Sequence, residues 1–224
     1  MIENIGSLVK GHVGIFSYDK DGGDRQCLVN QDNAIHSENM SRAIAYSLSS
    51  DLNYNLYEIH FGNGGVVVDT DGKLSYRKPN VSQSSDELYN PTYFKVISNI
   101  SDQNTDSNLN KIETSSVVGE LFSDLVITAT LDYDEPNSYD TTFNLADVND
   151  RDQPSLDQTS TIQSFTFNEL GLKTKGTAGL GKGNLLTHTI FHPVQKSTNR
   201  LIQIVYTLRF TVSENLNRDS RMSY

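Results

Sequence analysis

The chain has 224 residues, which is enough for one large domain or two small ones with a substantial core. Hydrophobic residues make up 36% of it and charged residues 21%, and its formal net charge is −10. Such an acidic surface argues against binding to nucleic acid or to anionic membranes, and no run of about 18 apolar residues predicts a membrane span.

Alternating apolar and polar residues predict a β-hairpin in the first part of the chain, followed by one helix. Residues Leu8 to Tyr18 have the pattern of a strand, and the turn DKDGGD leads into a returning strand, QCLVN. Residues 37–50 form the one clear helix candidate, with Ser37 expected to cap its N-terminus. The residues expected on one face of this helix are Met40, Ala43, Ile44, Ser47 and Leu48.

Short strands separated by turns are expected over the rest of the chain. VVVDTDGKLSY predicts a hairpin around Asp71 and Gly72, and the segment PTYFKVI opens with Pro91, as edge strands can. The most regular strand is the last, Leu201 to Val212, because six apolar residues share one of its faces. These six are Ile202, Ile204, Tyr206, Leu208, Phe210 and Val212, and the remaining strands are expected at residues 56–61, 121–133, 162–167 and 185–191.

Two long polar segments interrupt this pattern, at about residues 98–110 and 134–160. Loops of this length are uncommon within compact domains, and they either bind something or stay mobile. A solvated loop is one interpretation. The other is an arm that becomes ordered against a neighbouring subunit, for which segment 134–160 is the better candidate. Its apolar residues Tyr139, Phe143, Leu145 and Val148 would then be the anchors.

The pattern as a whole predicts a single β-rich domain that covers residues 1–224. Short strands, turn signals about every ten residues and one helix near residues 37–50 are typical of an all-β fold. We therefore expect a mainly antiparallel sandwich or a jelly-roll-like barrel.

The stretch GTAGLGKG, Gly176 to Gly183, fits most of the phosphate-binding pattern G-x-x-x-x-G-K-[ST]. Gly176, Gly181 and Lys182 match, but Gly183 replaces the Ser or Thr that would hold magnesium. The flanking sequences have the character of strands, whereas a phosphate-binding loop needs a helix after it. A glycine-rich hairpin loop therefore explains the stretch better, and we expect it not to bind nucleotide.

The histidines do not form a metal-binding pattern. His188 and His192 are four residues apart, but on a strand this spacing separates them by about 13 Å, too far to share one zinc ion. Thr189 also stands where an H-E-x-x-H motif has its glutamate. His60 lies within a predicted strand and is expected to be half-buried and hydrogen-bonded.

The remaining polar candidates have ordinary structural explanations. The acids Asp19, Asp21 and Asp24, and the pair Asp69 and Asp71, lack the full register of a calcium loop and suit turns. Cys27 is the only cysteine, which fits a reducing compartment, and we expect it to be buried or half-buried. The sequence therefore predicts no catalytic, cofactor-binding or metal-binding residues, and no cofactor.

Several stretches resemble small virion structural proteins of tailed bacteriophages. They are NAIHSENMSRAIAYSLS (33–49), YEIHFGNGGVVVDTDGKLSYRKPN (57–80), LYNPTYFKV (88–96), FNELGL (167–172) and LLTHTIFHPVQKSTNRLIQIVYTLRF (185–210). The resemblance covers most of the chain except the two polar segments. Its motifs belong to the framework of the fold, and the family has no functional residues to carry over to this sequence.

What the resemblance implies is a non-enzymatic virion component, at the neck, collar or tail more than in the capsid shell. Its partners would be copies of itself in a symmetric ring and other virion proteins, assembled in the host cytoplasm. A carbohydrate- or receptor-binding β-sandwich is the alternative, although the chain has no Trp, which sugar sites favour. A hydrolase or nucleotidase is the third hypothesis, and no active-site pattern supports it.

Overall fold

The computed structural model describes residues 5–19, 25–82, 86–136 and 164–214. Its strands are β1 (Ile5–Asp19), β2 (Gln26–Ile35), β3 (Leu56–Gly62), β4 (Val66–Val68), β5 (Leu74–Tyr76), β6 (Pro91–Val96), β7 (Lys111–Ser116), β8 (Phe122–Leu131), β9 (Ser164–Thr174), β10 (Leu185–Ser197) and β11 (Arg200–Glu214). The helix α1 (Ser37–Leu48) and a 3₁₀ turn, η1 (Leu52–Tyr54), follow β2. Nowhere in these ranges is there a helix with the length and apolarity of a membrane span.

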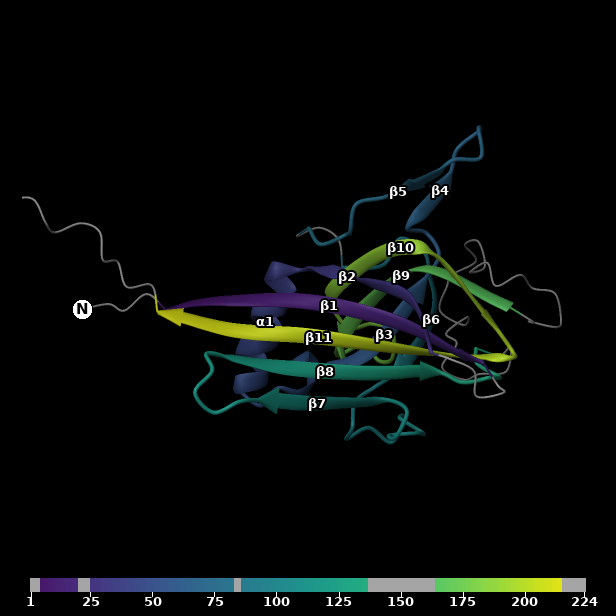
Figure 1. Cartoon of the computed structure of the whole chain (residues 1–224). Helices are drawn as coiled ribbons and strands as arrows, with labels where there is room; N and C mark the ends of the chain where they lie inside the picture. Colours follow the sequence, from purple (N-terminus) through teal and green to yellow (C-terminus); the bar gives the residue numbers. More distant parts are fainter. Residues whose placement is uncertain (1–4, 20–24, 83–85, 137–163, 215–224) are drawn as a thin grey trace, which may run out of the picture.

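One curled antiparallel sheet of nine strands forms the frame of the molecule (Figure 1). The strand order is β6-β3-β9-β10-β2-β1-β11-β8-β7, and β4 and β5 form a separate two-stranded ribbon. The mainly-β fold class and the single helix are confirmed. The core is enclosed by this one sheet, which curls into a half-barrel, in place of two separate stacked sheets.

The inner face of the sheet carries the core, and β11 lies well inside the sheet between β1 and β8. Ile202, Ile204, Tyr206 and Leu208 are at most 1% exposed, as the alternating pattern predicts. Phe210 is half-buried, and Val212 is 49% exposed because the strand runs beyond the core at its end. The period-2 pattern therefore identifies the core strand and overestimates the length of its buried part.

Side chains close the curl where the two edges of the sheet approach each other. Lys95 Nζ on edge strand β6 donates to the Thr130 carbonyl on β8 at 2.6 Å. The polar segment 98–110 links β6 to β7, and its neighbour Ile112 exchanges two hydrogen bonds with the Asn99 side chain, at 2.6 and 2.8 Å. Asn110 Oδ1 accepts the Thr130 amide at 3.1 Å. The polar loop therefore serves as a strap across the open side of the sheet.

Helix α1 lies at the other end of the half-barrel (Figure 1) and packs Met40 and Ala43 into the core. Its N-terminal cap is His36, whose Nδ1 accepts the Asn39 amide at 3.3 Å. The prediction that Ser37 caps the helix is wrong, because a ring nitrogen one residue earlier supplies the acceptor. The helix ends where Ser50 takes a positive φ of 66°, a conformation that stops a helix at its C-terminus.

Several strands differ from the sequence-based expectation, and β2 runs five residues beyond its expected segment QCLVN, to Ile35. β7 was not expected, because its sequence KIETSS is polar; as an edge strand it exposes its last four residues to solvent. β9 and β10 are longer than their predicted segments of 162–167 and 185–191. Pro193 lies within β10, where a register shift between Ile190 and Val194 interrupts the ladder, and such irregular positions tolerate a proline.

Truncation of the core strand should test its place in the sheet. We expect Ile204→Ala to lower the free energy of unfolding by about 2–5 kcal/mol, the range for large-to-small changes in a packed core. Val212→Ala on the same strand is the matched control, because its side chain is half exposed, and should cost well under ~1 kcal/mol. Urea unfolding measures both, and equal losses would contradict the assignment.

Candidate functional site

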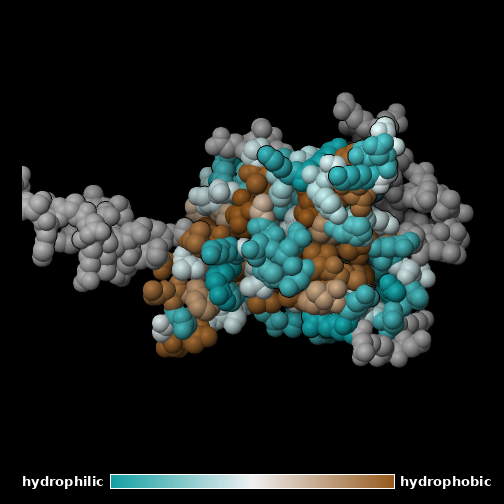
Figure 2. Space-filling model, turned by 45° about the horizontal axis from the view of Figure 1, so that its top comes forward, coloured by the Kyte–Doolittle hydropathy of each residue, from teal (hydrophilic) through white to brown (hydrophobic). Residues whose placement is uncertain are grey.

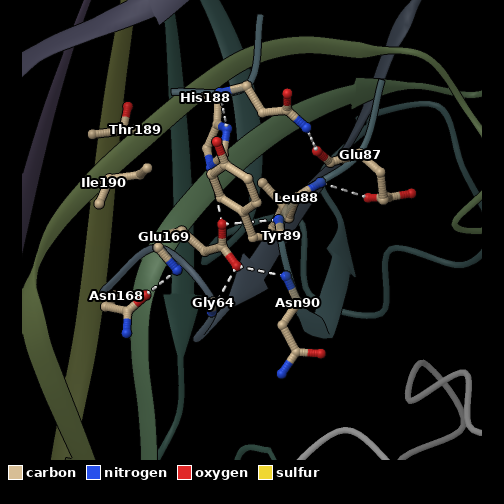
Figure 3. Close-up of polar contacts among 12 residues, drawn as sticks. Gly64, Glu87, Leu88, Tyr89, Asn90, Asn168, Glu169, His188, Thr189 and Ile190 are labelled. Carbon is tan, nitrogen blue, oxygen red and sulfur yellow. Dashed lines mark hydrogen bonds and ion pairs between the residues drawn. The ribbon is translucent and has the colours of Figure 1, made fainter. Parts of the chain in front are cut away.

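The most connected polar group among the described residues is the carboxylate of Glu169 on β9 (Figure 3). Its Oε1 accepts the amides of Gly64 and Asn90, each at 2.9 Å. Its Oε2 accepts the amide of Tyr89 at 3.1 Å and Nε2 of His188 at 3.0 Å. One carboxylate thus joins β9, β10, the turn after β3 and the segment before β6.

The surroundings of His188 fix the tautomer of its ring. Nδ1 faces the amide of Asn80 at 2.7 Å and must accept, so Nε2 carries the hydrogen that it donates to Glu169. Burial raises the pKa of Glu169, but the hydrogen bonds from His188 and from the amides of Asn90, Gly64 and Tyr89 outweigh burial and leave the pKa below its ordinary value. The carboxylate is therefore held as an anion.

The pair does not have the access that a catalytic acid and base need. The side chains of Glu169 and His188 are 0% exposed, and both ring nitrogens of His188 are engaged. Next to them, Asn168 on β9 accepts the Gly65 amide at 2.8 Å and donates to the Asn63 carbonyl at 3.0 Å. The arrangement fixes backbone segments to the sheet, which is a structural role.

The Glu169 network gives a specific expectation for Glu169→Gln. Gln has one acceptor oxygen in place of two, and its NH₂ would face amide hydrogens, so we expect a loss of about 3 kcal/mol in the free energy of unfolding. A carboxylate with a lowered pKa stabilises the fold above its ordinary pKa of 4.5, and the effect disappears as the pH falls through the folded-state pKa.

The difference between wild type and variant should therefore be full at pH 7 and shrink below the ordinary pKa of 4.5. Urea unfolding across this pH range is the measurement. Glu113→Gln on the exposed strand β7 is the matched control and should change little. A Glu169→Gln protein with wild-type stability at pH 7 would refute the assigned role.

A second buried carboxylate, Glu58 on β3, holds the glycine-rich stretch that resembles a phosphate-binding loop. Both oxygens of Glu58 lie 3.0 Å from the Gly181 amide, and Oε2 also accepts Nε2 of His60 at 2.9 Å. Lys173 donates to the Gly181 carbonyl at 3.1 Å and to Glu87 at 2.6 Å. The Gly181 amide, which a phosphate would need, is already bound to a carboxylate within the chain.

The glycines of this stretch are required by its backbone. Strands β9 and β10 flank it, so it is a hairpin loop, without the helix that a phosphate-binding loop needs. Gly176 and Gly181 have φ angles of 71° and 76°, which favour glycine. A Cβ on Gly183 would lie 1.7 Å from the Thr174 carbonyl oxygen. That nucleotide does not bind stays a prediction.

The other sequence candidates lie apart from one another. His192 is exposed and lies 3.1 Å from the Tyr76 hydroxyl, whereas His188 is buried in the Glu169 network. His60 is hydrogen-bonded as expected but buried further, to 3% exposure, with its ring stacked on Phe94. Within the described ranges, no group of three or more His, Cys, Asp or Glu residues is placed to hold a metal ion.

The acidic turns and the cysteine complete the set of candidates. Asp69 Oδ1 accepts the amides of Asp71 and Lys73, so it stabilises the tip of the β4–β5 hairpin. Asp19 pairs with Arg200 at 3.3 Å, and Asp21 and Asp24 lie outside the described residues. The expectation that Cys27 is buried or half-buried is wrong, because its side chain is exposed. β2 pairs with β10 only at Ala34 and Ile35, at the opposite end of the strand from Cys27. Around Cys27, β2 therefore has β1 as its one neighbouring strand among the described residues.

Two buried lysines near the end of β8 were not found by sequence reasoning. Lys196 on β10 is 2% exposed and donates to the carbonyls of Tyr133 and Ser197, at 3.2 and 2.9 Å. Lys95 contacts Glu135 as well as Thr130. Val194, two residues before Lys196, also faces the core. Because side chains two residues apart on a strand point to the same face, this alternation is the signal from which the buried position of Lys196 could have been predicted.

Lys196 should make stability depend on pH in the alkaline range. Burial lowers the pKa of Lys196 from 10.5 to about 8, against the opposite effect of Glu135, Asp132 and Asp134. Between these two values the unfolded chain binds more protons than the folded one, so the free energy of unfolding should rise with pH. Lys196→Met should abolish this rise, whereas exposed Lys10→Met should retain it. Urea unfolding at several pH values checks this, and an unchanged rise in Lys196→Met would contradict it.

Several grooves open on the described surface. An apolar groove of about 440 Å³ lies between α1 and strands β8 and β11, and another of about 590 Å³ lies on the β1 and β2 side of the helix. A polar groove of about 330 Å³ lies between the β4–β5 ribbon and β10, and its walls include Asp32, Arg77 and His192. These grooves, unlike the buried carboxylates, are accessible to another molecule.

Comparison of the chain with known protein families, with curated proteins and with solved structures finds no match. Its function is therefore inferred from its own residues.

Proposed function

We propose that this chain is a non-enzymatic structural component of a tailed-phage virion, present as copies in a symmetric oligomer at the neck, collar or tail. The observation that supports the proposal is that stretches of sequence that resemble phage virion proteins contact one another in the fold. They are numbered here in chain order, from 33–49 as the first to 185–210 as the fifth. Glu58 and His60 come from the second stretch, Asn90 from the third, Glu169 from the fourth and His188 from the fifth. Four separate stretches thus supply the two buried carboxylate networks.

The position of these residues supports a role in the framework of a subunit. Each polar group described in the two networks is bound within the chain, and the networks fix the loops around β3, β9 and β10. Because these polar groups are bound inside the molecule, contacts with other proteins fall to the outer surface. A structural subunit of an assembly works through surface contacts of this kind. Segment 134–160, the candidate arm, lies outside the described residues except for its first three positions.

Purified particles of the virus that encodes this chain provide the test. We expect mass spectrometry to find the chain at a fixed number of copies per particle, and an averaged electron cryo-microscopy map to show the half-barrel repeated by symmetry. The chain's absence from particles that are otherwise complete would overturn the proposal.

The polar groove beside the β4–β5 ribbon favours a second candidate, a carbohydrate- or receptor-binding module. Tyr76 is the last residue of the ribbon and Arg77 follows it, whereas His192 and Asp32 come from the sheet. Tyr can provide the aromatic surface on which a sugar packs, and charged groups can bind its hydroxyls.

A glycan array separates the two candidates. The structural proposal expects no glycan to bind above background, with the wild-type protein and Tyr76→Ala giving the same result. Binding by the wild type that Tyr76→Ala reduces at least about tenfold, and that the distant Tyr46→Ala leaves unchanged, would favour the attachment module instead.

A further inference from the structure

Exposed apolar side chains gather at the end of the half-barrel that holds α1. Leu48 at the end of the helix is 84% exposed, and Val118 in the turn between β7 and β8 is fully exposed. Leu121 accepts the Val212 amide at 3.0 Å, so this turn lies against the end of β11. In Figure 2, hydrophobic surface gathers at the left end of the molecule, the end at which α1 lies in Figure 1. We call this surface the apolar end; its most exposed members are Leu8, Leu48, Val117, Val118, Leu121 and Val212.

The apolar end combines a projection and a recess. Val117 and Val118 form the tip of the β7–β8 turn, at 60% and 104% exposure. The 440 Å³ groove opens beside it, with Ile44 and Leu48 on the helix facing Leu125 and Phe210 on the sheet. Most of its walls are apolar side chains, and its polar lining residues are Ser47, Thr114, Ser123 and Asp124, whose carboxylate pairs with Arg209. Because a projection and a matching recess lie on one surface, that surface can complement a copy of itself.

We propose that the apolar end binds the apolar end of a second copy about a two-fold axis, with the β7–β8 tip of each copy in the groove of the other. Such a contact is isologous: the same patch serves both copies, and the contact closes at two. The inference rests on the proposed function, since it names the surface by which the subunits of that oligomer meet. Dihedral assemblies combine such two-fold contacts with rings.

The size of the apolar end suits a stable dimer. Of the twenty different residues that line the two grooves beside α1, Met40, Ala43, Leu186 and Leu208 are buried, and the other sixteen reach the surface. The tip and strand ends add Val117, Val118, Leu121 and Val212, which brings the surface residues to twenty. An interface of standard size takes roughly 20–30 residues from each partner. A contiguous apolar surface of this extent is unusual on a protein that stays monomeric.

The charges also favour a copy of the chain at this end. A net charge of −10 makes two copies repel each other over most of their surface. Around the grooves, Arg209 pairs with Asp124 at 2.7 Å, and Arg42 pairs with Glu38. Within each of these two pairs the charges offset each other, and Glu120 in the β7–β8 turn adds one negative charge beside Arg209. The apolar end therefore carries far less net charge than the chain as a whole, which lowers the repulsion between two acidic copies that meet there.

Sedimentation equilibrium of the full chain tests the contact. We expect wild type to dimerise, and Val118→Asp to raise the dissociation constant at least about 30-fold, because a carboxylate would enter an apolar groove without a partner. Ile100→Asp is the matched control, since Ile100 is 77% exposed on the strap loop at the opposite end. Wild type that stays monomeric at 100 µM (about 2.5 mg/ml, from the 25.0 kDa chain), or a dimer unaffected by Val118→Asp, would overturn the inference.

Cross-linking tests the seating of the tip. Two variants in a Cys27→Ser background, Val118→Cys and Leu48→Cys, are mixed and treated with a short bismaleimide. A tip in the partner's groove predicts a mixed 118–48 product that exceeds both self-linked products. Self-linked Val118→Cys alone would show a tip-to-tip contact and contradict the seating. Circular dichroism of each variant verifies its fold, and Val118 is exposed enough that its replacement should leave the fold intact.

The outcomes for the contact and for the virion role are distinct. A dimer that requires Val118, from a chain that is absent from particles, supports the contact and removes the virion role. A monomeric chain that is present in particles removes the contact and keeps the virion role.

Discussion

The hydrogen bonds to the buried Glu169 carboxylate are the interaction on which the loops around β3, β6 and β10 depend. A buried anion is costly unless its lone pairs are filled, and here three backbone amides and one imidazole fill them. Because the donors come from the turn after β3, the segment before β6 and strand β10, the anion also sets where those segments run. Glu58 does the same on a smaller scale for the loop between β9 and β10. These loop amides are thus held by carboxylates in the sheet, in place of hydrogen bonds within the loops themselves.

The two ends of the half-barrel are built by opposite means. Where β6 approaches β8, the polar strap of residues 98–110 and the lysine Lys95 close the curl with hydrogen bonds. Where α1 lies, apolar side chains occupy the opening only in part and leave a groove on each side of the helix. The molecule therefore has one closed polar end and one open apolar end.

Local sequence patterns were enough to predict most of the strands and the helix, but neither of the hydrogen-bond networks around Glu169 and Glu58. The alternation of Ile202, Ile204, Tyr206 and Leu208 identified a core strand because a pleated sheet repeats every two residues. The helix face of Met40, Ala43, Ile44, Ser47 and Leu48 was likewise visible in the sequence, and it lines the 440 Å³ groove. The donors to Glu169, however, lie 19, 79, 80 and 105 residues away along the chain, so no local window contains them. The exposure of Cys27 and the cap at His36 also depend on tertiary neighbours, and sequence reasoning missed both.

The short junction between β2 and β10 divides the sheet mechanically. Only two residue pairs, Thr187 with Ile35 and His188 with Ala34, carry the ladder there, whereas β1 and β11 are paired along fifteen residues. Across the same junction, the Gln31 side chain donates to the Ile190 carbonyl and the His36 amide donates to the Leu186 carbonyl, each at 2.9 Å. Under a load applied across the strands, the few bonds at this junction would break before those of the long ladder. The sheet thus consists of two well-paired parts, β6-β3-β9-β10 and β2-β1-β11-β8-β7, joined by the short ladder between β10 and β2. A change in the curvature of the sheet would occur at that ladder.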